Sequence, residues 1–267
     1  MLRVSGILLY IPLFIFNICF SLTNLYGNLP RDVSVLRYNL VEGLPDIYID
    51  QISEKIGRTW MKGYVWDKDL IHKFYSLLPK NDFFVVLDLG DQTGSFSLLS
   101  KYFPNSKWYS FEPIKEASDA LKNNLILNNI SNVLVYQKAA MDFSGKVKLK
   151  MPAMDLWGLA TIGDSPQRFD TFIEREVECI DLDSFVNEKN IAKVHFMKLD
   201  TEGAELYILR GAKKMIERDH PIILMEYNED NMKQCGVLKG SVNEFLKEMG
   251  YEWKLVSHED ILCTPIS

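Results

Sequence analysis

The sequence predicts an α/β domain built on a mostly parallel β-sheet with helices on both faces. From residue 83 onward, short apolar runs typical of buried strands alternate with segments of helical periodicity. The first run leads into a turn with two glycines, Gly90 and Gly94, as expected at the carboxyl edge of such a sheet. The last two candidate strands are separated only by a short turn, which predicts an antiparallel strand at the sheet edge.

The N-terminus differs in composition from the rest of the chain. Arg3 precedes a stretch without a charged side chain that continues as far as Arg31. Its densest apolar part, residues 7–20, has the length of a signal-peptide core, and Ser21 is small enough to precede a cleavage site. Taken over residues 4–25, the same segment is long enough to cross a bilayer as an uncleaved anchor. Both alternatives predict membrane association or export, whereas a buried N-terminal helix is the third possibility for the same segment.

These boundaries divide the chain into three parts. Residues 1–21 are expected to be a signal peptide or membrane anchor, which places the protein in the secretory pathway, secreted or held at the endoplasmic reticulum or Golgi membrane. Residues 22–80, with many turn-forming glycines and prolines and one helical pattern after Asp67, are expected to pack on the domain as an N-terminal extension. Residues 81–267 are expected to form the domain itself. A chain of 267 residues with 47% hydrophobic content is large and apolar enough to build one hydrophobic core.

The net charge and the cysteine content limit the classes of molecule that the protein is expected to bind. The net charge of −6 and the pI near 5.4 argue against nucleic acid as a partner, because nucleic-acid binders present a clustered basic face. The four cysteines show no metal-ligand spacing, and no metal is predicted from them. We therefore expect a small-molecule substrate. No pattern in the sequence indicates the oligomeric state.

Six apolar runs are candidate strands of the sheet: residues 83–87, 107–111, 133–137, 176–180, 194–199 and 221–227. Two more, 251–256 and 260–264, are expected to form the antiparallel pair at the edge. Residues 204–218 carry one continuous apolar stripe and are expected to form one helix. Ser241 and Glu244 have the spacing of a capping box that opens a helix, which Gly250 then closes.

The turn after the first strand has the pattern Asp88-x-Gly90-x-x-x-Gly94, with Gly94 expected to open a helix. This spacing differs from the Gly-x-Gly-x-x-Gly of dinucleotide sites and lacks the Gly-Lys-Ser/Thr of a P-loop. Asp91 within the turn also opposes a pyrophosphate through like-charge repulsion. Glu112 ends the next strand, at the position where a carboxylate can hold ribose hydroxyls. Together these residues favour a nucleoside without phosphates, of which S-adenosylmethionine is the obvious example.

A third motif makes the resemblance to a known family specific. Residues 196–205 read Phe-Met-Lys-Leu-Asp-Thr-Glu-Gly-Ala-Glu, and residues 221–226 form a later strand ending in Glu226. With the Asp-x-Gly-x-x-x-Gly turn and Phe111-Glu112-Pro113, the chain resembles the FkbM-type methyltransferases over residues 85–227. Family members commonly carry Ala-Asn where this chain has Asp91-Gln92.

The resemblance implies a seven-stranded class I methyltransferase sheet, of the Rossmann-like kind, and methyl transfer from S-adenosylmethionine, most often to oxygen. It implies that the cofactor contacts Asp88, Gly90, Gly94 and Glu112, and that Ala140 lies near the adenine. On this reading the chain methylates a hydroxyl of a small molecule, sugar or lipid. The alternative is a catalytically inactive relative that uses the fold as a binding or trafficking module, suggested by the export-like N-terminus and the altered turn.

Asp200 and Glu202 are the candidate catalytic residues, because they follow the fourth strand of the sheet and could orient an acceptor and remove its proton. Their structural alternative is a favourable interaction with the N-terminus of the helix that follows. Lys198, inside a buried strand pattern, is expected to pair with a neighbouring acid. Asp200, Glu226 and Asn228 also offer oxygen ligands for magnesium, a minor alternative to a metal-free site.

Overall fold

The computed structural model describes residues 35–50, 60–61, 64–65, 67–152, 157–163 and 171–266. The predicted signal peptide or anchor, residues 1–21, lies outside the described residues. Within the described ranges, no helix combines the length and the hydropathy that crossing a membrane requires.

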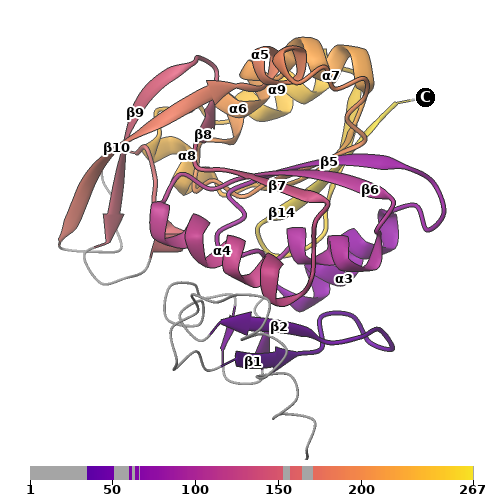
Figure 1. The fold of residues 1–267 in the computed structure, drawn as a ribbon. Helices are drawn as coiled ribbons and strands as arrows, with labels where there is room; N and C mark the ends of the chain where they lie inside the picture. Colours follow the sequence, from indigo (N-terminus) through magenta and orange to yellow (C-terminus); the bar gives the residue numbers. More distant parts are fainter. Residues whose placement is uncertain are drawn as a thin grey trace, which may run out of the picture. The chain divides into compact units, whose positions relative to one another are not determined.

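Seven strands form the central sheet, in the order β13-β14-β12-β11-β5-β6-β7. The five strands from β12 to β7 are parallel, whereas β14 runs antiparallel to both β12 and β13. The predicted mostly parallel sheet with an antiparallel C-terminal edge is therefore confirmed (Figure 1). The strands are β5 (Phe84–Leu89), β6 (Ser106–Phe111), β7 (Val133–Tyr136), β11 (Phe196–Leu199), β12 (Ile222–Glu226), β13 (Tyr251–Leu255) and β14 (Asp260–Pro265).

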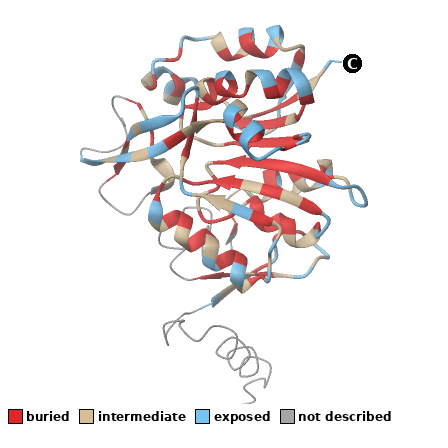
Figure 2. Cartoon of the chain, turned by 45° about the horizontal axis from the view of Figure 1, so that its top comes forward, coloured by how far each residue is buried: buried red, intermediate tan, exposed pale blue. Residues whose placement is uncertain are grey.

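Strand β5 is the middle one of the five parallel strands, and every residue of its sequence, FVVLDL, is buried, so both of its faces are covered. Val86 belongs to one hydrophobic core, and Leu87 belongs to the other, as the two-residue period of a strand requires. Figure 2 shows this continuous burial along the central strands. The chain runs outward from β5 through β6 to β7, and then returns to β11 on the other side of β5. The carboxyl ends of β5 and β11 therefore form the topological switch point, where open α/β sheets bind ligands.

Helices cover both faces of the sheet (Figure 1). One face carries α3 (Lys68–Leu77), the 3₁₀ helix η1 (Ser97–Tyr102) and α4 (Lys115–Leu127), whose apolar residues join the core around Val86. The other carries α5 (Leu182–Glu188), α6 (Glu205–Gly211), α7 (Lys213–Asp219) and α9 (Ser241–Glu248), around Met197. The predicted helix after Asp67 corresponds to α3.

Part of the predicted N-terminal extension packs on the helices beside the sheet. Strands β1 (Val35–Tyr38) and β2 (Ile47–Asp50) form an antiparallel pair, and β3 (Trp60–Met61) pairs with β4 (Tyr64–Val65). The backbone N–H of Asp50 donates to Asn124 Oδ1 of α4 at 2.9 Å, and that of Tyr48 donates to Asn128 Oδ1 at 2.9 Å. The described residues from Val35 onward form one compact unit.

The predicted strand at 176–180 exists, but it does not belong to the central sheet. It lies in β10 (Phe172–Asp181), which joins β8 (Ala139–Met141) and β9 (Gly145–Pro152) in a separate three-stranded sheet of order β8-β10-β9. The prediction was wrong because β10 alternates exposed charged residues with less exposed ones, unlike a strand buried on both faces. Its exposed Glu176 pairs with Lys146 of β9 at 2.7 Å.

Three predictions about helices also need correction. The stripe over residues 204–218 forms two helices, α6 and α7, separated at Ala212, whose φ of −112° and ψ of 8° are not helical. Gly211, beside this break, lies against the backbone of β8, where a Cβ would come 2.0 Å from Met141 O. Ser241 is not a capping residue, since α9 begins after Gly240 without a side-chain cap. Gly94 does not open a helix directly; η1 starts at Ser97. Helix α9 does end just before Gly250, as predicted.

Candidate functional site

A cavity of about 280 Å³ lies at the carboxyl edge of the sheet, next to the switch point. Its walls come from the loop after β5, the end of β6, strand β8, the short 3₁₀ helix η2 (Trp157–Leu159), and the ends of β11 and β12. Among the predicted site residues, those that line it are Gly90, Glu112, Ala140, Asp200 and Glu202. Five of the seven predicted site residues therefore line one cavity at the predicted edge of the sheet.

Gly90 brings the loop after β5 into contact with the loop after β11. Its φ of +81° lies in the left-handed region, and a Cβ there would come 1.9 Å from the carbonyl oxygen of Asp200. Its backbone N–H donates to Phe111 O at 2.9 Å, which ties the same turn to the end of β6. Only glycine fits this junction, and its backbone lies directly at the cavity wall.

Glu112 places a buried carboxyl group at the wall of the cavity. The residue is 6% exposed, its Oε2 accepts from Gln92 N–H at 3.0 Å, and its Oε1 accepts from Ile114 N–H at 2.8 Å. Burial raises the pKa of Glu112 to about 8, although the two backbone donors act in the opposite direction. Because each carboxylate oxygen has two acceptor sites, each can still accept one hydroxyl from a ligand.

Asp88 and Gly94, both predicted to contact the cofactor, do not line the cavity. Asp88 is 1% exposed, and neither carboxyl oxygen has a hydrogen-bond partner among the described residues. Burial and the nearby Asp91 carboxylate raise the pKa of Asp88 well above its usual range, which favours the neutral form of this group. Gly94 faces the core instead, against Leu98 and Leu121. Asp88 and Gly94 therefore lie in the interior of the domain, under the turn that follows β5.

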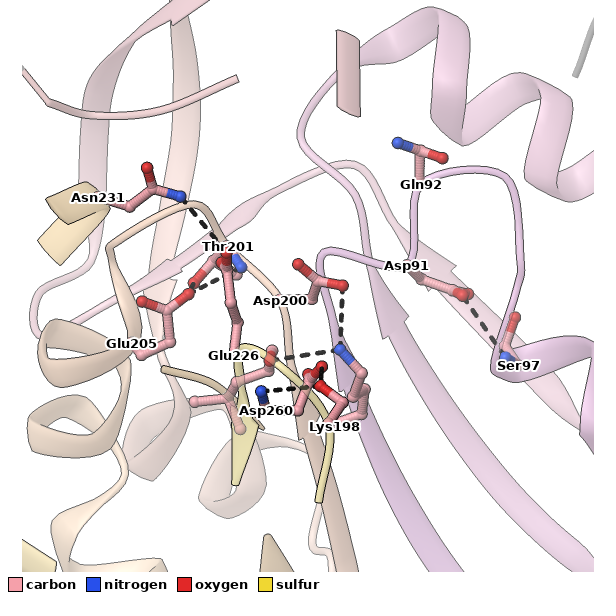
Figure 3. A network of polar contacts seen from close by, with 12 residues as sticks. Asp91, Gln92, Ser97, Lys198, Asp200, Thr201, Glu205, Glu226, Asn231 and Asp260 are labelled. Carbon is pink, nitrogen blue, oxygen red and sulfur yellow. Dashed lines mark hydrogen bonds and ion pairs between the residues drawn. The ribbon is translucent and has the colours of Figure 1, made fainter. Parts of the chain in front are cut away.

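The unusual pair Asp91-Gln92 divides between the interior and the cavity (Figure 3). Asp91 is 2% exposed and accepts from Ser110 Oγ at 2.6 Å, so its carboxyl group is not presented to a ligand. Gln92 has φ of +54° and lines the cavity. Its amide nitrogen lies 1.6 Å from the position that a Cβ on Gly158 would take, so the absence of a side chain at Gly158 lets η2 approach this loop.

Lys198 and Asp200 form the ion pair that the sequence predicted for Lys198. The ammonium Nζ lies 3.0 Å from Asp200 Oδ2, while the Lys198 side chain is 1% exposed and that of Asp200 is 42% exposed (Figure 3). Burial alone would lower the pKa of Lys198, but the carboxylates of Asp200 and Asp260 outweigh it and raise that pKa above its usual range. The Lys198 side chain is therefore positively charged, and its ammonium group lies buried near the carboxyl end of β11.

Glu202 lies in the loop after β11, and Glu226 ends the neighbouring strand β12. Both residues line the cavity. Asn231, on helix α8 (Glu229–Gln234), donates from Nδ2 to Glu202 Oε2 at 2.8 Å and to Glu226 Oε1 at 3.3 Å. Burial, followed by the charges of Asp200 and Glu205, raises the pKa of Glu226 to about 10. Glu226 therefore carries a proton at neutral pH.

Sequence reasoning missed three acidic residues of this wall, Asp67, Glu259 and Asp260. Asp67 immediately precedes α3, and Asp260 begins β14, opposite Glu226 in the antiparallel register. Burial and the charge of Asp200 raise the pKa of Asp67 to about 6. The antiparallel edge pair was the only signal that could have placed Asp260 beside Glu226. We call the wall formed by Asp67, Asp200, Glu202, Glu226, Glu259 and Asp260 the acidic end of the cavity.

The magnesium alternative required Asp200, Glu226 and Asn228 to converge. The first two line the cavity, but Asn228 is engaged elsewhere. Its Oδ1 accepts from the backbone N–H groups of Asp230 and Asn231 at the start of α8, and its amide donates to Glu259 Oε1 at 3.0 Å. Across the described residues, no group of three or more histidines, cysteines or acids is arranged to hold a metal ion.

The strand order, the glycine turn and the carboxyl group at the end of β6 define the class I methyltransferase fold. Within that class, the chain belongs to the family described as the Methyltransferase FkbM domain, which matches residues 88–253. The chain is therefore a methyltransferase, and its cofactor is S-adenosylmethionine.

Two relatives share this assignment. Methyltransferase sdnD of Sordaria araneosa is 25% identical over 205 residues, covering 66% of this chain and 75% of the relative. Methyltransferase 1 of Beauveria bassiana (strain ARSEF 2860) is 26% identical over 164 residues, covering 55% and 66%. Among solved structures, the chain is similar to Methyltransferase FkbM from Methylobacillus flagellatus KT, with a TM-score of 0.48 and 18% identity, over 71% of this chain and 45% of that one.

The residues around the cavity fit S-adenosylmethionine. The glycine turn brings backbone to the cavity wall, Glu112 retains acceptor sites for ribose hydroxyls, and Ala139 and Ala140 supply small side chains beside them. The described residues that line the cavity, Lys138 included, do not form a cluster of positive charge. Such a lining suits a ligand without phosphate groups. Glu112 and the backbone at Gly90 would hold the nucleoside, with Ala140 beside the base.

Proposed function

We propose that this methyltransferase modifies a hydroxyl oxygen of a small molecule, sugar or lipid. The observation that carries the proposal is the placement of Asp200 and Glu202 in the cavity that also contains Gly90 and Glu112. Bound S-adenosylmethionine supplies an electrophilic methyl group. The attacking hydroxyl must lose its proton as the new bond forms, and a carboxylate within hydrogen-bond reach can accept that proton.

The two carboxyl groups are held by different parts of the protein. Lys198 fixes Asp200 from below through the 3.0 Å ion pair, while part of the Asp200 side chain stays open to the cavity. Asn231 fixes Glu202 from the side. We assign acceptor orientation and proton removal to Asp200 and Glu202 together, since both face the same space.

The test combines labelled S-adenosylmethionine with a panel of hydroxyl-bearing small molecules, sugars and lipids, and measures labelled product. Asp200→Asn and Glu202→Gln keep shape but remove the carboxylate, so the variant that loses the general base should lose roughly 10²–10⁴-fold in rate. Glu252→Gln, on the exposed strand β13, is the matched control and should keep wild-type activity. Wild-type rates in both site variants would exclude this assignment.

Gln92 lines the same cavity in a left-handed conformation and extends its amide into the space beside Gly158. Calorimetric titration of the folded full chain with S-adenosylmethionine and S-adenosylhomocysteine tests cofactor binding separately from methyl transfer. We expect heat of binding for both ligands. No binding of either at millimolar ligand would contradict the proposed function and favour the alternative role as a binding module.

We further propose that residues 1–21 direct the chain to the secretory pathway or anchor it in a membrane. The support is the apolar N-terminal stretch between Arg3 and Arg31. Membrane fractionation of cells that express the chain with a C-terminal tag, compared with a chain lacking residues 1–21, tests the proposal. Identical distribution of the two forms would contradict it.

A further inference from the structure

Asn231 lies behind the acidic end of the cavity and does not itself line it. It belongs to the first turn of α8, where its backbone N–H donates to Asn228 Oδ1 at 3.1 Å. Its carbonyl group packs against Gly203, where a Cβ would come 2.5 Å from Asn231 O. These two contacts fix the backbone of Asn231 relative to the loop that carries Glu202.

The side-chain amide of Asn231 connects two carboxyl groups that come from different strands. Nδ2 donates at 2.8 Å to Glu202, which follows β11, and at 3.3 Å to Glu226, which ends β12. An amide nitrogen carries two N–H groups and can serve both acceptors at once. The shorter hydrogen bond goes to Glu202, and a donated hydrogen bond favours the ionised form of the carboxyl group that receives it.

Two carboxyl groups joined to one amide lie too close to ionise independently. The groups that face Glu226 are Asp200, Glu202 and Lys198 from β11 and its loop, Glu205 from α6, Asp260 from β14 and the Cys235 thiol beyond α8. Lys198 is the only cation in this set, and its ion pair is with Asp200. The negative surroundings and the burial of Glu226 favour its neutral form.

We propose that Asn231 is a positioning residue that keeps Glu202, rather than Glu226, as the ionised member of this pair. The neutral Glu226 can then donate a hydrogen bond, while Glu202 is ready to accept a proton. The use of Glu202 as a proton acceptor rests on the proposed function. The division of charge between the two residues does not, and it can be measured without a methyl acceptor.

The experiment is a pH titration of the full chain by NMR, with glutamate labelled by carbon-13 at its carboxyl carbon. Glu202→Gln and Glu226→Gln each remove one signal and so assign the pair. In the wild-type chain we expect Glu202 to titrate at lower pH than Glu226. Asn231→Ala should raise the Glu202 midpoint by about one pH unit, a tenfold change in its acid dissociation constant. Asn231→Asp, which keeps the shape but adds a charge, should raise it at least as far.

Asp230→Ala, on the exposed side of the same turn, is the matched control and should leave both midpoints in place. The proposal is overturned if Glu226 titrates below Glu202 in the wild-type chain, a result that needs no variant to fold. It is also overturned if Glu202 keeps its midpoint in a folded Asn231 variant. Calorimetry with S-adenosylhomocysteine on the same samples reports separately on the proposed function, since loss of binding there would not change the midpoints expected for the pair.

Discussion

Glu112 combines deep burial with two donated hydrogen bonds, and these have opposite effects on its carboxyl group. Burial favours the neutral acid, whereas the N–H groups of Gln92 and Ile114 favour the carboxylate. Burial dominates, and the pKa is raised to about 8. At neutral pH the free protein therefore holds a proton at the position where ribose hydroxyls would donate.

This balance predicts that cofactor affinity depends on pH. Hydroxyls that donate to Glu112 favour its ionised form, so binding lowers its pKa and releases a proton below pH 8. The affinity for S-adenosylhomocysteine should rise from pH 6 to pH 8, by at most about tenfold per pH unit, and then level off. Calorimetry in two buffers of different ionisation enthalpy measures both the affinity and the released proton.

Glu112→Gln supplies the control for that measurement. The variant cannot ionise, so its affinity should be flat between pH 6 and pH 8, and weaker than wild type at pH 8 by about 1–3 kcal/mol. Glu112→Ala should lose a similar amount. A wild-type affinity that does not change with pH would exclude the ribose role of an ionising Glu112.

At the residue scale, the sequence identified Glu112 because a strand pattern and the Phe-Glu-Pro motif both place it at the sheet edge. It did not separate Asp88 and Asp91, which lie beneath the turn, from Gln92, which lines the cavity. The direction of a side chain within a tight turn depends on backbone torsions such as the φ of +54° at Gln92, which residue spacing does not determine.

At the scale of elements, hydrogen bonds within the loop between β11 and α6 hold that loop in its conformation. The Glu205 side chain, 0% exposed, accepts at Oε1 from the Thr201 backbone N–H at 2.9 Å and from the Thr201 hydroxyl at 2.8 Å. Gly203 then allows α8 to pack on the same loop. The second half of the family motif, residues 200–205, is therefore this loop and the first residue of α6, and its hydrogen bonds hold the loop that carries Asp200 and Glu202.

Gly203→Ala should be among the most damaging glycine substitutions in the chain. The φ of +105° already disfavours any side chain, and the new Cβ would come 2.5 Å from Asn231 O and 2.7 Å from Cys235 Sγ. We expect a loss of about 2–4 kcal/mol in the free energy of unfolding, from backbone strain together with overpacking. Urea denaturation measures this loss.

Gly240→Ala is the matched control, because Gly240 has a similar positive φ of +84° but nothing within 4 Å of its added Cβ. It should lose only about 1 kcal/mol. Equal losses in the two variants would show that α8 does not pack tightly on Gly203.

The elements themselves were predicted with unequal success. The long apolar strands were recognised, because burial on both sheet faces produces a continuous apolar run. The break between α6 and α7 was not, since the apolar stripe continues through it. β10 was placed in the wrong sheet because an apolar run indicates a strand but does not identify the strands with which it pairs, here β8 and β9.

At the scale of the whole molecule, the fold brings carboxyl groups from five separate segments around one buried lysine, Lys198. Asp67 precedes α3, Asp88 lies in β5, Asp200 follows β11, Glu226 ends β12, and Asp260 begins β14. No local pattern in the sequence marks this set, because the strand order alone assembles it. The switch point of the sheet could be predicted from the alternation of strands and helices, whereas its acidic character could not.

This buried acidity predicts an unusual dependence of stability on pH. Burial raises the pKa of Asp67 to about 6, that of Glu112 to about 8 and that of Glu226 to about 10, whereas in the unfolded chain these groups have ordinary values near 4. The folded protein therefore binds protons that the unfolded chain has released. Stability from this source is complete below the unfolded pKa and is lost as pH rises through the folded values.

The free energy of unfolding of the ligand-free chain should thus be larger at pH 5.5 than at pH 8.5, by on the order of 8 kcal/mol, with the largest share from Glu226 and the next largest from Glu112. Many proteins show little change or the opposite trend over this range. Urea denaturation at fixed ionic strength measures the difference, and Glu112→Gln should reduce it, because that side chain no longer has a proton to lose. A stability that stays constant or increases toward pH 8.5 would mean that these carboxyl groups are ionised within the folded protein at neutral pH.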